Sequence, residues 1–287
     1  MPIVTGYEDT PGGHDALVLG AQLCRLTGLA ALVATVHSTD VRRLTAAVED
    51  PRYLLKTQQV ARRRFAEARE FVGEGWGEIE PEFAELGPGP IPDVLSEYAD
   101  EVGAAVLVVG STGHGLLGRL SPGRTVQRLL PLANCPVAIA PRGYRHIASR
   151  SRTPSPIRVV SVAYDGSTEA DHAIAVAVHL ASRTGAVLRF VTVAETEDDV
   201  EAAHKTVNKG VAGVPAELDT LADVVVGPVA RTLADLPETT DLLVIGSRGY
   251  RVLRRVVLGG VAGFLVRNAR YPVLVVPGLD DPPAQIR

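Results

Sequence analysis

Residues 242–249 read Leu242-Leu-Val-Ile-Gly-Ser-Arg-Gly249, and Gly259-Gly260 follow after nine further positions. An apolar run of this kind, without alternation, is typical of a strand buried on both faces of a parallel sheet. The glycines after it let the backbone turn tightly into a helix. Turns from a buried strand into a helix are where α/β proteins bind phosphates, so this stretch predicts both the fold and a candidate site.

The same stretch occurs earlier in the chain as Val106-Leu-Val-Val-Gly-Ser-Thr-Gly113, with Gly123 after nine further positions. The glycine positions differ by 246−110, 249−113 and 259−123, each 136. Pro272 and Pro277 lie at the same offset from Pro136 and Pro141. The chain is therefore a tandem repeat of two similar units.

Length and composition agree with two soluble units. A chain of 287 residues has room for about two domains, each large enough for its own core. A net charge of −4 argues against a general nucleic-acid or membrane-surface binder. The two cysteines, Cys24 and Cys135, form no disulfide framework or metal-ligand spacing, and no apolar run approaches 18 residues. These features predict a cytoplasmic protein.

The domain boundaries follow from composition. Residues 142–156 contain mainly Ser, Pro and Arg with one isoleucine, which is too little apolar surface to form a core. This composition predicts a solvated linker, and a docking segment is the alternative. The first unit is then 1–141, the second 157–278, and 279–287 form a Pro-rich, charged tail that is expected to fray.

Strands and helices alternate in both units. The expected strands are 3–7, 29–36, 76–83, 106–109 and 137–140 in the first unit, and 159–164, 188–193, 224–226, 242–246 and 273–276 in the second. Between its first acidic site residue and its final proline, the first unit spans 141−8 = 133 and the second 277−165 = 112. This difference predicts an extra helix in the first unit, within 41–72. The pattern predicts an α/β fold of two Rossmann-like domains, each a five-stranded parallel doubly wound sheet that binds ligands at the carboxyl ends of its strands.

These residues resemble the universal stress protein superfamily in its tandem two-domain form. Its ATP-binding members carry Gly-x2-Gly-x9-Gly-Ser/Thr after a buried strand, and an acidic residue at the end of strand one, often within Asp-Gly-Ser. The matching positions are Asp165, Gly166, Ser167, Gly246, Gly249 and Gly259 in the second unit, and Glu8, Asp9, Thr10, Gly110, Gly113 and Gly123 in the first. The endings Cys135-Pro-Val-Ala-Ile-Ala-Pro141 and Tyr271-Pro-Val-Leu-Val-Val-Pro277 also look like this family's last strand. The resemblance implies an adenine nucleotide alpha hydrolase-like fold with strand order 3-2-1-4-5.

The resemblance also implies a ligand, ATP or AMP/ADP with Mg²⁺. Asp165 and Glu8 would accept hydrogen bonds from the adenosine, while Val193 and Val36 either pack the adenine or belong to the sheet core. Free backbone amides at the helix that Gly259 opens favour phosphate. Both units depart from the pattern after the last glycine, where Gly260 stands in the second unit and Arg124-Thr125 in the first. Loss of one hydroxyl–phosphate hydrogen bond costs roughly 1.5–3 kcal/mol, so we expect weaker sites and rank the second unit first.

Other chemistries have little support in the sequence. Gly113 to Gly118 matches G-x-G-x-x-G, but no acidic residue follows at the required distance, and Arg119-Leu120 replaces the Lys-Ser/Thr of a P-loop. His114 in this loop is interpreted as exposed, with a phosphate contact as the alternative. No nucleophile and base occur together, so catalysis would be slow ATP hydrolysis at most.

Three functions follow from these observations. The first is a nucleotide-binding stress-response regulator with an unidentified regulatory protein partner. The second is a nucleotide-free interaction module on the same fold, and the third an ATP-using synthetase or hydrolase. The resemblance implies that 137–140 pair with 273–276, within one chain or between chains as a homodimer.

Overall fold

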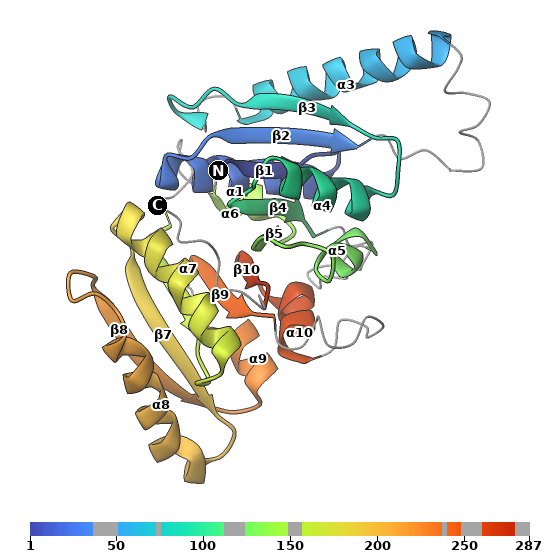
Figure 1. The fold of residues 1–287 in the computed structure, drawn as a ribbon. Coiled ribbons are helices and arrows are strands. Elements are labelled where there is room, and N and C mark those ends of the chain that lie inside the picture. The colour runs from blue at the N-terminus through green and yellow to red at the C-terminus, as the bar shows by residue number, and fades with distance from the viewer. Residues whose placement is uncertain are drawn as a thin grey trace.

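The computed structural model describes residues 1–36, 51–72, 76–111, 124–148, 157–236, 240–247 and 260–278. Its strands form one ten-stranded sheet in the order β3-β2-β1-β4-β5-β10-β9-β6-β7-β8 (Figure 1). Strands β1–β5 make the first unit and β6–β10 the second. Numbered within each unit, both orders are 3-2-1-4-5, as the family resemblance implies.

The elements of the first unit are β1 (Ile3–Gly6), α1 (Pro11–Thr27), β2 (Ala31–Val36), α3 (Pro51–Val72), β3 (Glu82–Leu86), α4 (Ile91–Glu101), β4 (Val106–Gly110), α5 (Arg124–Leu129), β5 (Val137–Ala140) and α6 (Tyr144–Ala148). Those of the second unit are β6 (Val159–Ala163), α7 (Thr168–Thr184), β7 (Val187–Ala194), η2 (Glu197–Asp199), α8 (Val200–Ala212), β8 (Thr220–Val226), α9 (Val229–Ala234), β9 (Leu242–Gly246), α10 (Gly260–Asn268) and β10 (Val273–Val276). Among the described helices, none is long and apolar enough to cross a membrane.

The two halves of the sheet meet at an antiparallel junction. Strands within each unit pair in parallel, whereas β10 pairs antiparallel with β5, so that Leu274 lies opposite Ala138. The expected pairing of the last strands is therefore confirmed within the chain. Because β5 also pairs with β4, and β10 with β9, both edges of each strand are occupied within the chain, while a homodimer stays a prediction.

The first helix of each unit is defined by matching caps. Thr10 caps α1 by accepting a hydrogen bond from the Gly13 amide (3.1 Å), and α1 ends at Gly28 with φ 66°. Ser167 caps α7 by accepting from the Ala170 amide (3.3 Å), and α7 ends at Gly185 with φ 65°. Both glycines adopt the left-handed conformation that ends helices without a Cβ penalty. The caps differ by 167−10 and 185−28, both 157, an offset that aligns this part of the two units.

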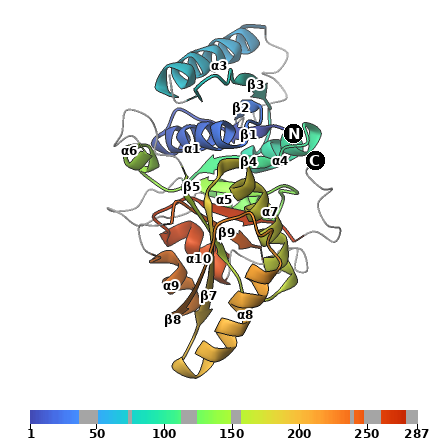
Figure 2. The same ribbon diagram turned by 90° about the vertical axis from the view of Figure 1, so that its left-hand side faces the viewer.

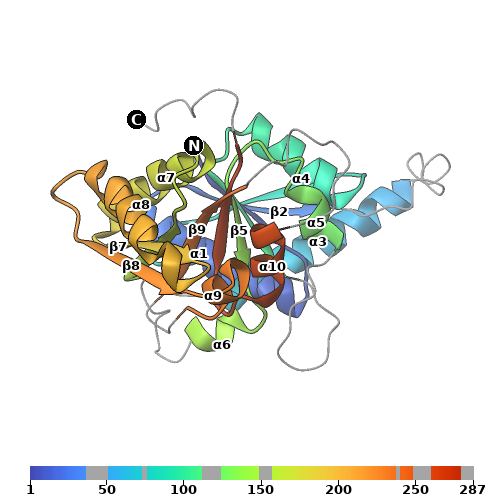
Figure 3. The same ribbon diagram turned by 90° about the horizontal axis from the view of Figure 1, so that it is seen from below.

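Helices cover both faces of the sheet. On one face α1 and α7 pack against each other across the junction, with α6 beside α1 (Figure 2). On the other face α4 and α5 cover the first unit, while α9 and α10 lie side by side over the second (Figure 3). Each face has its own apolar cluster, and each cluster contains residues of both units. The two units therefore share their cores.

Among the described residues, each unit carries one helix between its second and third strands, α3 and α8. The region 41–72, where an extra helix of the first unit was expected, contains α3, and its residues 41–50 lie outside the described residues. The sequence analysis did not predict α8. The connection has 81−36 = 45 residues in the first unit and 219−194 = 25 in the second, so its length accounts for the difference. The sequence pattern of α8 is weak because the helix is mostly charged and buries only a narrow stripe, Ala203, Val207 and Gly210. The third strand of the first unit, expected at 76–83, lies at Glu82–Leu86.

The predicted solvated linker was wrong at its start. Residues 144–148 form α6, and Tyr144 is buried against α1, where its hydroxyl donates to Gln22 Oε1 at 2.6 Å. Composition did not predict α6 because this five-residue helix is held by few contacts, namely the buried ring of Tyr144 and two hydrogen bonds from backbone amides to Asp15. Residues 149–156, and the tail 279–287, lie outside the described residues.

Candidate functional site

Each unit has a crevice at the carboxyl ends of its first and fourth strands, as expected for a doubly wound sheet. The crevice of the second unit, called crevice two below, has a volume of about 530 Å³. Its apolar wall is made by Val191, Val193, Val229, Leu233, Ile245 and Val261, and its polar residues are Asp165, Ser167, Glu169 and Glu195. A volume of this size falls within the roughly 300–1,000 Å³ of small-molecule pockets.

Asp165 stands at the mouth of crevice two, directly after β6. Its Oδ1 accepts from the Ser167 amide (3.0 Å) and from the Ser167 hydroxyl (2.6 Å), which closes a short turn with Gly166 at φ 80°. Ser167 in turn caps α7. The Asp-Gly-Ser stretch therefore has a structural task, because it fixes the start of the helix and the position of the carboxylate at the crevice.

The strand-end glycines are required by close packing. A Cβ on Gly246 would lie 2.6 Å from the carbonyl oxygen of Glu169, at the start of α7. A Cβ on Gly110 would collide with the carbonyl of Gly12 in the same way. Only glycine lets the first helix of each unit approach the fourth strand so closely, and this approach shapes the floor of each crevice.

The helix that follows the glycine loop begins differently in the two units. Gly260 opens α10 with φ 80°, and no atom of the described residues lies within 4 Å of the position that a Cβ would take. Gly260, Val261 and Ala262, at the start of this nine-residue helix, line crevice two, and the first amides of a helix have no partner within it. In the first unit Arg124 opens α5, and Thr125 lines the crevice.

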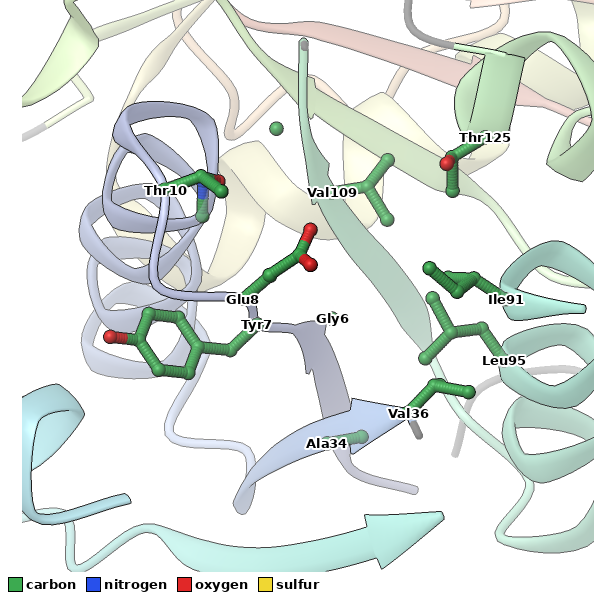
Figure 4. A pocket seen from close by; sticks show the side chains of 12 residues that line it. Gly6, Tyr7, Glu8, Thr10, Ala34, Val36, Ile91, Leu95, Val109 and Thr125 are labelled. Atoms are coloured by element: carbon green, nitrogen blue, oxygen red, sulfur yellow. The ribbon is translucent and has the colours of Figure 1, made fainter. Parts of the chain in front are cut away.

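The crevice of the first unit, crevice one, has a volume of only about 60 Å³. Figure 4 shows the Glu8 side chain extending into it, toward the space between Val109, Ile91 and Thr125. Three lining residues are smaller than in crevice two, since Gly6, Gly13 and Ala34 replace Ala163, Ala170 and Val191, whereas Glu8 is longer than its counterpart Asp165. In addition, Leu95 of α4 lies 3.0 Å from the position of a Cβ on Gly6. The missing methyl group at Gly6 therefore leaves room for Leu95 at this crevice.

A tyrosine directly precedes the acidic residue of each crevice, and the sequence analysis did not predict either tyrosine as a site residue. The Tyr164 hydroxyl donates to Asp171 Oδ1 (3.0 Å), and its pKa is raised by burial first and then by this carboxylate. Burial likewise raises the pKa of Tyr7 to about 12, and the Tyr7 hydroxyl lies 3.4 Å from His14 Nε2. Their position directly before Asp165 and Glu8 was the available signal.

The structure brings together most of the predicted residues. Asp165, Ser167, Val193, Gly246 and Gly260 line crevice two, while Glu8, Thr10, Val36, Gly110 and Thr125 line crevice one. Gly166 supports the turn without lining the crevice, and Asp9 Oδ1 lies 3.4 Å from His14 Nε2. Gly113, His114, Gly123, Gly249, Gly259 and the Arg124 side chain lie outside the described residues.

Metal-ligand groups are absent from the described part of the chain, in which no three His, Cys, Asp or Glu side chains converge. The two cysteines are buried and unpaired, and burial raises the pKa of each thiol to about 12, so both are inert core thiols. The Ser167 hydroxyl lies beside a candidate base, Asp165, but it also caps α7 by accepting from the Ala170 amide.

Comparison with known proteins gives a consistent result. The sequence profile of the universal stress protein family matches residues 1–141 and 156–277. A universal stress protein of Mycobacterium tuberculosis is 29% identical over 97% of this chain and 100% of its own length. A second M. tuberculosis universal stress protein is 30% identical over 65% of each chain. The crystal structure of a universal stress protein from Archaeoglobus fulgidus covers 96% of this chain and 98% of its own, with a TM-score of 0.70 at 16% identity.

Proposed function

Because the chain belongs to the universal stress protein family, we propose that it is a cytoplasmic stress-response regulator that binds one adenine nucleotide in crevice two. The observation that carries the proposal is the second unit's combination of a 530 Å³ crevice, a carboxylate at its mouth and an unobstructed helix start across from it. Crevice one, at about 60 Å³, is too small for a nucleotide.

The residues of crevice two divide the ligand between two environments. Val191, Val193 and Leu233 offer an apolar wall for a flat base, and Asp165 offers a carboxylate oxygen for the ribose hydroxyls. The amides at Gly260 and Val261, with the positive end of the α10 dipole, face the position of the phosphates. Each part of the ligand therefore meets a group of matching polarity.

Mg²⁺ fits this arrangement as a companion of the phosphates. It binds proteins through one or two carboxylates and fills its remaining positions with phosphate oxygens and water. Glu169, in the first turn of α7, is the lining carboxylate that would share it with the ligand. A bound Mg²⁺ would supply positive charge between this carboxylate and the phosphates.

The proposed role is regulation by occupancy, with hydrolysis slow at most, because the hydroxyl that lies beside a carboxylate in crevice two, that of Ser167, is held as the cap of α7. The expected regulatory partner protein would distinguish the filled crevice from the empty one. For the first unit, the small volume of crevice one favours the second candidate, a nucleotide-free interaction module.

Calorimetric titration of the nucleotide-stripped protein with Mg·ATP tests the proposal, beside the matched variants Asp165→Ala and Glu8→Ala. We expect one nucleotide per chain, about tenfold weaker binding in Asp165→Ala, since a hydrogen bond to a charged group is lost, and unchanged binding in Glu8→Ala. No heat with the wild-type protein, together with no nucleotide released on denaturing the untreated protein, would contradict it. Equal losses in the two variants would contradict the assignment to crevice two.

A further inference from the structure

At the junction between the units, α1 and α7 pack against each other and correspond to each other at the offset of 157. Two sites at the junction are therefore equivalent, one against α1 and one against α7, and we call them the first and second positions. The first position lies against α1 and is filled by Tyr144. Its ring is 7% exposed, and its hydroxyl donates to Gln22. A phenol ring is therefore a structural part of the first position.

The second position lies against α7 and contains a cavity of about 180 Å³. Both units line it, through Ile3, Leu23, Thr27, Ala105, Val106 and Cys135 of the first and His172, Val176, His179, Leu180 and Val276 of the second. We call it the junction cavity. It is separate from crevice two, with which it shares no lining residue.

Two histidines in the junction cavity replace two partnered residues of the first position. His172 corresponds to Asp15 and His179 to Gln22, since 172−15 and 179−22 both equal 157. Asp15 accepts hydrogen bonds from the amides of Gly143 and Arg145, and Gln22 accepts one from Tyr144. By contrast, His172 Nδ1 and His179 Nε2 are buried with no hydrogen-bond partner among the described residues. Buried polar atoms without partners are costly, so these two nitrogens need an explanation.

The volume and lining of the junction cavity restrict what it can hold. An apolar protein cavity of about 150 Å³ stays dry and binds benzene, so about 180 Å³ accommodates a benzene ring with one or two substituents. Its described lining residues include no Asp, Glu, Lys or Arg. The cavity therefore suits an uncharged aromatic molecule, because a charged one would lose its hydration without a countercharge.

We propose that the junction cavity binds a small neutral phenol, whose ring takes the place that Tyr144 takes in the first position and whose hydroxyl pairs with His179. Burial, followed by the nearby Arg183, lowers the pKa of His179. The ring is therefore neutral at pH 7 and offers a hydrogen-bond acceptor, as Gln22 Oε1 does for Tyr144. The proposal is independent of nucleotide binding.

Titration of the full-length protein with 4-methylphenol, followed by NMR or calorimetry, tests the proposal. This probe reproduces the tyrosine side chain, and toluene is its matched control without the hydroxyl. We expect saturable binding of 4-methylphenol and about three- to tenfold weaker binding of toluene, since one neutral hydrogen bond is lost. His179→Leu should remove the difference between the two probes, whereas His179→Gln, which installs the residue of the first position, should retain it.

Two further variants locate the site. Val176→Phe fills the junction cavity and should abolish binding, while Gln22→Leu perturbs only the position that Tyr144 occupies and should leave it unchanged. Thermal unfolding of each variant shows that the chain is folded. Absence of saturable binding to the folded wild-type protein would overturn the proposal, as would binding that survives Val176→Phe. Equal affinity of the wild type for toluene and 4-methylphenol would overturn the role of His179.

Discussion

Crevices one and two have the same framework but differ almost ninefold in volume, about 60 against 530 Å³. Both have a tyrosine and an acid after the first strand, a capping hydroxyl and a glycine at the end of the fourth strand. One difference is the methyl group that Gly6 lacks and Ala163 carries, because Leu95 lies 3.0 Å from the position of a Cβ on Gly6. Another is the longer side chain of Glu8 in place of Asp165. The comparison teaches that the framework belongs to the fold, whereas the size of the site depends on the side chains and the helix packed around it.

The largest expected effect concerns what the two crevices share. Gly110→Val and Gly246→Val should each lower the free energy of unfolding by about 3 kcal/mol or more, because the new side chain meets the backbone of the first helix. Denaturant unfolding measures the loss. A mild effect on stability together with a strong effect on nucleotide binding would mean that these glycines serve the ligand instead.

The next effect separates the two crevices. Val229→Trp should fill crevice two and weaken Mg·ATP binding by at least about thirtyfold, the equivalent of roughly 2 kcal/mol. Ile91→Trp, at the matching position in crevice one, should leave the affinity unchanged. Calorimetry of the two variants side by side provides the measurement. A loss in Ile91→Trp alone would reverse the assignment of the site.

A smaller effect tests the cause of the difference in volume. Ala163→Gly should let Leu233 move toward β6 and weaken nucleotide binding by about threefold, the equivalent of roughly 0.6 kcal/mol. Gly6→Ala, the reciprocal change, should push Leu95 away and enlarge crevice one. Crystal structures of both variants would reveal the helix positions. Unmoved helices would show that another feature sets the volume.

The smallest effect depends on pH. Burial holds the pKa of folded His179 below its usual value, so as the pH falls below about 6.5 the unfolded chain takes up a proton that the folded chain does not. The contribution of His179 to the free energy of unfolding is therefore complete at pH 7 and decreases as the pH falls toward the pKa of His179 in the folded protein. His179→Gln should reduce the loss between pH 7 and 5.5, by less than the roughly 1.4 kcal/mol of one pKa unit. An unchanged pH profile of thermal unfolding would contradict this.

The sequence pattern predicted the repeat and the parallel strands, because buried parallel strands leave strong apolar runs such as Val106–Val109, whereas the strand order was implied by the family resemblance. The missed features depend on weaker or longer-range signals. The burial of α8 is confined to three small or β-branched residues, and α6 is held by contacts more than a hundred positions away. The volumes of the crevices could not be predicted, because the approach of Leu95 to Gly6 depends on tertiary packing and leaves no periodic pattern.

The antiparallel junction affects how the two units can diverge in sequence. Ala138 lies opposite Leu274, its own counterpart in the repeat, which is the register expected when two identical molecules meet about a twofold axis. Joining such a pair in one polypeptide replaces an encounter in solution with a tether, so the local concentration of each half near the other no longer depends on expression level. One unit can then lose its ligand and still support the fold of the other, and the unit that binds ligand does not depend on association with a second molecule.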